Sequence, residues 1–450
     1  MKNKTVDMIN GPMLGKILLF ALPLALSSIL QLAFNAADTI VVGRFAGSQA
    51  LAAVGSNGSL INLFVNAFMG LSIGANVLVA RYKGEGREDK MSRAVHTSVL
   101  LSMAGGCLVG ILGFIAAPQL LHLMSVPSDV INLSSIYLRI YFIGLPCLMT
   151  YNFGAAILRS VGDTKRPLVF LIISGIVNVC LNLVFVIIFK MSVAGVALAT
   201  IISELISAIL VIVTLTKESG PLKLDLHKLS IDSAIFKEIL KIGLPAGLQS
   251  CVFSLSNIVI QSNINSFGST IIAGNSAASN VEGFVYIGIN AFYQACLTFV
   301  SQNFGAKKLK RCDKALFLCS VSGVVVGLIL GMGVYIFGSQ VLGFYSTDPQ
   351  VIAAGMIRLK IIVRTYCICG LMDITVGALR GIGHSFIPTC ISLTGSCLLR
   401  LVWIATIFKI NPTIEMLYIV YPVSWIVTYA AQFACYAISK RKLNQQFKNA

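Results

Sequence analysis

Long apolar runs separated by short polar stretches dominate the chain. Each run is about 20 residues or longer, which is enough for a helix to cross the hydrocarbon core of a bilayer. About twelve runs can be read, near residues 15–42, 50–80, 93–117, 134–158, 167–189, 192–215, 236–265, 270–303, 314–337, 351–379, 387–408 and 413–438. This pattern predicts an all-α polytopic membrane protein with about twelve transmembrane helices.

Composition agrees with a membrane environment. Of the 450 residues, 56% are hydrophobic and only 11% are charged, and the mean hydropathy is +0.87. Soluble domains use roughly 45–50% apolar residues. The surplus of apolar side chains indicates that lipid, rather than a soluble core, receives them.

The second half of the chain repeats the first. Leu158-Arg159-Ser160-Val161-Gly162 recurs 221 positions later as Leu379-Arg380-Gly381-Ile382-Gly383, and Leu22-Pro23 recurs 222 positions later as Leu244-Pro245. Two diverged copies of one six-helix unit are a common plan of transporters.

Polar residues mark the boundary between the copies. Residues 217–235 hold alternating charges and Gly220-Pro221, which are typical of a loop. We therefore expect an N-terminal lobe at 1–216 with helices 1–6, a cytoplasmic linker at 217–235, and a C-terminal lobe at 236–450 with helices 7–12.

Basic residues predict the orientation. Most of the 34 Lys and Arg residues fall in segments on one side of the proposed topology, which assigns that side, and both termini, to the cytoplasm. The net charge of +17 is then mainly a topology signal, because the basic residues are dispersed among loops. We expect a multi-pass protein of the inner or plasma membrane that binds no nucleic acid.

No catalytic motif is present in the sequence. The twelve Cys lie almost entirely in apolar runs, where small buried hydrophobes are the ordinary interpretation. The four His (His96, His122, His227 and His384) are scattered, and no phosphate loop, nucleophile elbow or zinc spacing is found. The chain is not expected to be an enzyme or to carry a cofactor other than a coupling ion.

Four acids lie inside predicted spans: Asp38, Glu204, Glu282 and Asp373. A charge at the centre of a bilayer costs at least ~2.5–3.5 kcal/mol on insertion scales, so such residues usually serve a function. The alternative is a structural carboxyl that fixes helix packing, and Arg400 of the eleventh span can pair with one of them.

The repeats differ most around Asp38. Its counterpart is Ile260, and the counterparts of Asn178, Asn182 and Thr200 are also bulky side chains. Asn178 and Asn182 share one helix face, and Asp38, Asn182 and Thr200 lie in the outer half of the bilayer by rise per residue. A carboxylate among amide and hydroxyl oxygens suits a proton or a hard monovalent cation. An interhelical polar clamp is the alternative.

Glu204 lies one helical turn after Thr200, near the middle of the bilayer. Its counterpart is Trp425, so the shared fold does not require the acid. We expect Glu204 to relay protons between Asp38 and the cytoplasm. A protonated Glu bonded within its own bundle, or facing lipid, is the alternative.

These features together resemble a known family. Leu22-Pro23, Asp38-Thr39-Ile40-Val41-Val42-Gly43-Arg44, Ala52-Ala53-Val54-Gly55 and the duplicated Leu-Arg-x-x-Gly at Arg159 and Arg380 are similar to the multidrug and toxic compound extrusion (MATE) transporters. The resemblance covers nearly the whole chain. Because Phe253 stands where the NorM-like branch has an acid, the chain resembles the DinF-like branch more closely.

The resemblance implies cation-coupled export of amphipathic, often cationic compounds by alternating access in a V-shaped fold of two lobes. It implies that Asp38 is the coupling residue and that Asn152, Asn178, Asn182 and Thr200 are its partners. H⁺, or Na⁺ held by Asp38, Asn178, Asn182 and Thr200, remains open as the coupling ion. We expect Glu282 and Asp373 to give negative potential to the substrate cavity, and we expect a monomer.

One rival has a related architecture. A flippase for lipid-linked saccharides would favour a basic cavity for the diphosphate, whereas the four acids counted above are opposed mainly by Arg400. A receptor or membrane enzyme would need a ligand domain or a catalytic cluster, and neither is seen.

Overall fold

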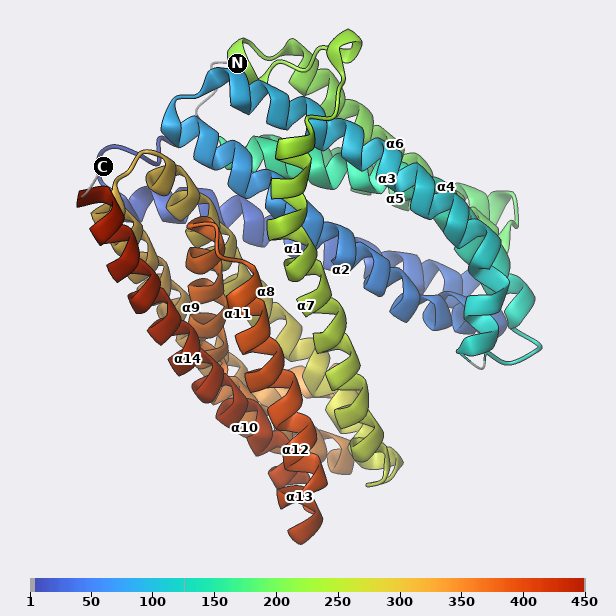
Figure 1. The fold of residues 1–450 in the computed structure, drawn as a ribbon. Coiled ribbons are helices and arrows are strands. Elements are labelled where there is room, and N and C mark those ends of the chain that lie inside the picture. Colours follow the sequence, from blue (N-terminus) through green and yellow to red (C-terminus); the bar gives the residue numbers. More distant parts are fainter. Residues whose placement is uncertain (1–4, 125, 449–450) are drawn as a thin grey trace. The chain divides into compact units, whose positions relative to one another are not determined.

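The computed structural model describes residues 5–124 and 126–448, and within these ranges it contains helices and no strand (Figure 1). The helices of the first half are α1 (Leu14–Phe45), α2 (Ser48–Glu85), α3 (Glu88–Leu123), α4 (Ile131–Ser160), α5 (Lys165–Leu183), the π-helix η1 (Val184–Ile188) and α6 (Ser192–Lys217). Two short 3₁₀ turns, η2 (Gly220–Leu222) and η3 (Leu226–Lys228), follow. The second half contains α7 (Ser233–Asn265), α8 (Ser269–Gly305), α9 (Leu309–Gly343), α10 (Pro349–Gly381), α11 (Phe386–Ser392), the π-helix η4 (Leu393–Leu398), α12 (Leu399–Ala405), α13 (Ile407–Ile410) and α14 (Ile414–Lys448).

Eleven helical segments of the described chain are long and apolar enough to cross a bilayer, with the helices between Phe386 and Ile410 counted as one. The remaining long helix, α10, spans 33 residues but carries five charged side chains, Arg358, Lys360, Arg364, Asp373 and Arg380. The all-α polytopic fold predicted from the sequence is confirmed, and α10 buries two of its charged side chains, Arg358 and Arg380, inside the protein.

Glycine turns at matching positions show the duplication in the backbone. Gly47 before α2 and Gly268 before α8 have φ of 90° and 93°, and Gly162 after α4 and Gly383 after α10 have φ of 93° and 94°. Side chains rarely adopt these values, so only glycine allows the turns without strain. Both pairs stand 221 positions apart, the offset found in the sequence.

The chain forms two compact units that divide inside α1 and α7. The first unit contains residues 26–243 together with the described residues 5 and 6, and the second contains residues 7–25 and 244–448. The domain limits predicted above follow the sequence repeats and stay a prediction.

Helix α4 lies at the centre of the first unit, in contact with α2, α3 and α6. Glycines allow the close approach of α3, because a Cβ at Gly106 would lie 2.6 Å from the Cα of Pro146 and one at Gly110 would lie 2.7 Å from the Phe142 carbonyl oxygen. Without a hydrophobic drive between helices in lipid, such close backbone packing is a main source of association.

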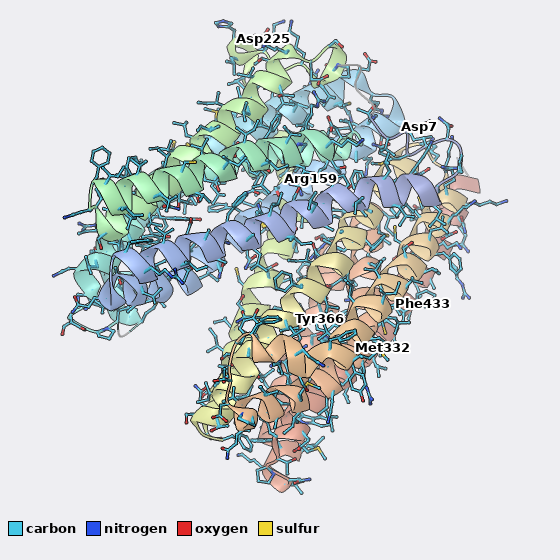
Figure 2. The ribbon with its side chains drawn as sticks, turned by 180° about the vertical axis from the view of Figure 1, so that it is seen from behind. Asp7, Arg159, Asp225, Met332, Tyr366 and Phe433 are labelled. Carbon is cyan, nitrogen blue, oxygen red and sulfur yellow. The ribbon has the colours of Figure 1, made fainter. Side chains whose placement is uncertain are left out.

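Helix α10 has the same place in the second unit, where it packs on α8, α9 and α14. A Cβ at Gly274 of α8 would lie 2.6 Å from the Gly355 nitrogen of α10. Apolar side chains cover the outside of this unit: Met332 of α9 and Phe433 of α14, labelled in Figure 2, are 43% and 51% exposed. Such side chains suit contact with lipid tails.

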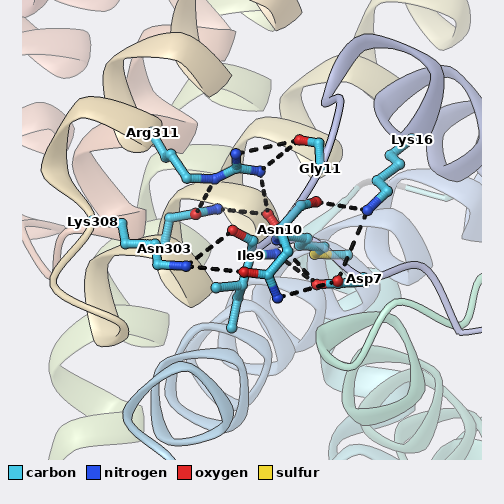
Figure 3. A network of polar contacts seen from close by, with 9 residues as sticks. Asp7, Ile9, Asn10, Gly11, Lys16, Asn303, Lys308 and Arg311 are labelled. Atoms are coloured by element: carbon cyan, nitrogen blue, oxygen red, sulfur yellow. Dashed lines mark hydrogen bonds and ion pairs between the residues drawn. The ribbon is translucent and has the colours of Figure 1, made fainter.

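A network of polar contacts fixes the N-terminal segment within the second unit (Figure 3). Asn303 donates to the Met8 carbonyl oxygen at 3.1 Å, and Arg311 donates to the carbonyl oxygens of Met8 and Gly11 at 3.3 Å. Partial burial acts to raise the pKa of the Asp7 carboxyl, but hydrogen bonds from the backbone N–H groups of Ile9 and Asn10 lower this pKa below its usual value. The charged carboxylate is therefore the form that the segment stabilises.

Replacing Gly162 tests the turn after α4. Besides its positive φ, a Cβ there would lie 2.4 Å from the Val6 carbonyl oxygen, whereas a Cβ at Gly268, with the same φ, would meet nothing within 4 Å. We expect Gly268→Ala to cost about 1–3 kcal/mol from backbone strain alone and Gly162→Ala to cost more. Thermal unfolding of both purified variants measures the difference, and equal losses would show that the Val6 contact adds nothing.

Candidate functional site

A carboxylate and two amides meet in the first unit. The side-chain N–H groups of Asn182 on α5 donate to the Asp38 carboxylate on α1 and, at 3.2 Å, to the side-chain amide oxygen of Asn178, one turn earlier. Asn178 and Asn182 are 5% and 0% exposed, and Asp38 is half-buried. Of the residues predicted for this site, the structure thus brings Asp38, Asn178 and Asn182 into direct contact.

Helix geometry at the end of α5 places these groups. The spacing of four residues puts both amides on one face, and the π-helix η1 begins two residues after Asn182. A π-turn widens the helix locally and is frequent at functional sites. The transition from α-helix to π-helix thus lies next to Asn182, whose side chain binds Asp38.

The surroundings of Asp38 are apolar. Val41, Val42 and Val186 belong to one buried cluster with Tyr137 of α4, and Tyr137 lies within electrostatic range of the Asp38 carboxylate. No Lys or Arg of the described residues forms an ion pair with Asp38. The carboxylate therefore has amide donors but no compensating positive charge.

Two predicted partners of Asp38 bond within their own helices. The Thr200 hydroxyl donates to the Val196 carbonyl oxygen at 2.9 Å, and the Asn152 amide donates to the Leu148 carbonyl oxygen at 3.0 Å. The hydrogen bonds of the described residues do not connect either side chain to Asp38. The Thr200 oxygen keeps its lone pairs available as an acceptor.

Glu204 on α6 is half-buried and lies within electrostatic range of Tyr141, Cys147 and Tyr151 of α4. It forms no ion pair within the described part of the chain. Its neighbours are weakly polar groups, and no hydrogen bond among the described residues leads from Glu204 to Asp38.

In the second unit, Glu282 of α8 has a cationic partner that the sequence interpretation did not consider. Arg358 of α10 donates to both carboxylate oxygens of Glu282, at 2.9 and 2.8 Å, and to the side-chain amide oxygen of Asn275 at 2.7 Å. Both charged side chains are buried, Glu282 to 4% and Arg358 to 8% exposure. A bidentate pair of this kind largely cancels the field of Glu282.

The signal for Arg358 was present in the sequence, because it stands inside the apolar run 351–379. Arg400 is therefore not the main buried cation opposed to the four acids, because Arg358 is buried as well. The pairing of Arg358 with Glu282 could not be predicted from the sequence, because it depends on the register of α8 against α10.

A cavity of about 310 Å³ lies next to this pair, within the second unit. Its walls come from α7, α8, α10 and α14, with lining residues Asn257, Ile260, Gln261, Ile264, Ser279, Glu282, Gly283, Tyr286, Arg358, Ile362, Tyr366, Tyr421 and Trp425. Tyr366 is labelled in Figure 2. Of the two acids predicted for a substrate cavity, Glu282 lines this one, whereas Asp373 does not line it but lies within electrostatic range of Tyr286, which does.

Comparisons with known proteins agree with this architecture. The probable multidrug resistance protein YoeA of Bacillus subtilis is 28% identical over 382 residues, which are 83% of this chain and 82% of that protein. The FAD transporter of Shewanella oneidensis is 25% identical over 401 residues, or 86% and 87% of the two chains. A crystal structure of MATE in complex with MaL6 matches with a TM-score of 0.92 at 20% identity and covers 99% of this chain and 100% of that one.

The family model MatE matches the chain twice, at residues 23–184 and 245–406. The two matches begin 222 residues apart, which agrees with the duplication read from Leu22-Pro23 and Leu244-Pro245. Together they cover well over half of the chain, and the resemblance to the MATE transporters is confirmed at the level of the family. The chain belongs to the MatE family.

Proposed function

We propose that this protein is a cation-coupled antiporter that exports amphipathic compounds by alternating access, with Asp38 as the residue that binds the coupling cation. The observation that carries the proposal is a carboxylate in a membrane span that is held by a buried amide and has no cationic partner among the described residues. Binding of H⁺ or Na⁺ would supply the missing positive charge, and its release would restore the negative one.

The side chains around Asp38 suit a hard cation. Asn182 uses its N–H groups on Asp38 and Asn178, while its carbonyl oxygen is buried and has no hydrogen-bond partner among the described residues. A buried acceptor without a donor is costly, and a Na⁺ ion would satisfy it. Asp38, Asn182, Asn178 and Thr200 would then supply oxygens, which are the ligands that hard cations prefer.

Export requires that the cation and the compound favour different conformations. A ligand shifts a conformational equilibrium only by its difference in affinity for the two states, and the coupling between two ligands is reciprocal. We propose that cation binding at Asp38 and substrate binding compete in this sense. The inward flow of the cation would then drive the substrate outward.

Relatives support the export of small compounds. YoeA is named a probable multidrug resistance protein and the Shewanella relative is named an FAD transporter, so we do not propose a single substrate. The expectation of cationic substrates rested on the negative potential of Glu282 and Asp373. Because Arg358 offsets Glu282, we propose amphipathic substrates without limiting them to cations.

The remaining proposals concern location and assembly. We propose that the protein lies in the inner or plasma membrane as a monomer, with both termini in the cytoplasm. The distribution of basic residues along the sequence supports the orientation.

Neutralising Asp38 tests the coupling. Asp38→Asn keeps the size of the side chain but can neither exchange a proton nor balance a cation, so efflux driven by a H⁺ or Na⁺ gradient should fall to the level of protein-free liposomes. The measurement is efflux of a fluorescent dye from proteoliposomes under each gradient applied separately. Asp129→Asn, the same change at an exposed aspartate between α3 and α4, should transport like the wild type. Undiminished efflux by the Asp38 variant would disprove the assignment.

Glu204→Gln tests the proton relay proposed from its position. The amide keeps the shape and hydrogen bonding of the side chain but does not titrate, so H⁺-driven efflux should slow severalfold while the affinity for the dye stays unchanged. Rates in proteoliposomes between pH 6 and 8 give the measurement. Wild-type rates throughout that range would assign Glu204 a purely structural role.

A further inference from the structure

Arg400 of α12 is a buried cation whose partners in the described chain are all neutral. It is 3% exposed, and it donates to the Ser424 hydroxyl at 3.1 Å and to the side-chain amide oxygen of Asn257 at 3.5 Å. Its guanidinium carbon lies 4.4 Å from the centroid of the Tyr421 ring. Arginine stays protonated in proteins. A buried charge without a counter-charge is costly, so a binding partner that supplies one would be favoured.

Arg400 lies behind the wall of the cavity of the second unit, in contact with two residues of that wall. Asn257 and Tyr421 both line that cavity. The bond to Asn257, at 3.5 Å, is at the limit of a hydrogen bond and can be exchanged for an oxygen of a ligand at little cost.

The acids near the cavity are already engaged. Glu282 accepts two hydrogen bonds from Arg358, and the Asp373 carboxyl lies within electrostatic range of Arg380 and of the Tyr286 side chain. No ion pair joins either acid to Arg400 in the described structure. The charge of Arg400 therefore remains for a ligand.

Aromatic rings form a large part of the wall. The ring centroid of Tyr366 lies 6.4 Å from that of Tyr286 and 5.4 Å from that of Trp425. The centroids of Tyr421 and Trp425 are 5.9 Å apart, and all three pairs have edge-to-face geometry. The volume of about 310 Å³ is near the lower end of the range of ligand pockets. A compact planar ring fits between such side chains, where aromatic contacts add to burial.

We propose that this cavity binds a small aromatic compound with an anionic group, such as a carboxylate, sulfonate or phosphate. The anionic group binds Arg400, and the ring packs against Tyr366, Tyr421 and Trp425. The inference deepens the proposed function, on which it rests, by naming a substrate class for the second unit.

Fluorescence of Trp425 gives a direct test that needs no ion gradient. The chain has two Trp, and Trp403→Phe leaves Trp425, which lines the cavity, as the only one. Quenching of the full-length protein in detergent is measured with 4-nitrobenzoate, 4-nitrobenzyl alcohol and 4-nitrobenzylammonium, which share a quenching ring and differ in charge. We expect saturable quenching, with half-saturation for the benzoate at about tenfold lower concentration than for the alcohol, as one charge-assisted hydrogen bond provides.

Arginine variants in the same background locate the anion. Arg400→Gln should remove the tenfold preference, and Arg400→Lys should keep part of it. Arg364→Gln is the control, because Arg364 of α10 also stacks on a tyrosine, Tyr335 at 4.1 Å, but neither Arg364 nor Tyr335 lines the cavity, whereas two partners of Arg400 do. It should keep the full preference, and gel filtration checks that each variant is folded.

Several results would overturn the proposal. Equal quenching by the benzoate and the alcohol, a preference for the ammonium compound, or an equal loss in the Arg364 and Arg400 variants would each do so. If Asp373 were the counter-charge of Arg400, the preference would emerge only in Asp373→Asn, which also contradicts the proposal. Asp38→Asn should bind the benzoate like the parent protein, so a failure of the coupling proposal and a failure of this one are separable.

Discussion

A polar group inside a membrane span has to find its partner within the protein, because hydrocarbon offers none. The same requirement that makes every span of this chain a helix also governs its charged side chains. Arg358 binds Glu282 and Asn275, and Asp38 is held by Asn182. The polar helix α10 can lie among α8, α9 and α14 because its buried charges are satisfied there.

The two units meet this requirement in different ways although their backbones correspond. Matching glycines turn the chain at the same positions, and α4 and α10 have equivalent central places. The first unit places acids, Asp38 and Glu204, in spans without cationic partners among the described residues, whereas the second opposes its acids with buried arginines. Duplication has thus preserved the helix packing and allowed the electrostatics to diverge.

Much of this fold could be predicted from the sequence, since apolar length, glycine positions and the repeat offset are local properties. The contact between Asp38 and Asn182 was anticipated in kind, because amides spaced by four residues must share a helix face. The partnership of Arg358 with Glu282 was not, because it joins residues 76 positions apart through the register of two helices. Thr200 shows a second limit: its hydroxyl bonds to its own helix, a choice of rotamer that spacing alone cannot predict.

The N-terminal segment imposes an order on biosynthesis. Met8 is synthesised at the start of translation, but Asn303, which binds its carbonyl oxygen, follows 295 residues later. At about 5–20 residues per second, this interval lasts roughly 15–60 s. During this time the Met8 carbonyl oxygen lacks this donor, although Val6, two residues earlier, can already bind the Gly162 carbonyl oxygen. Docking of residues 8–11 on Asn303 and Arg311 must therefore be a late event, which follows the synthesis of α1 to α8.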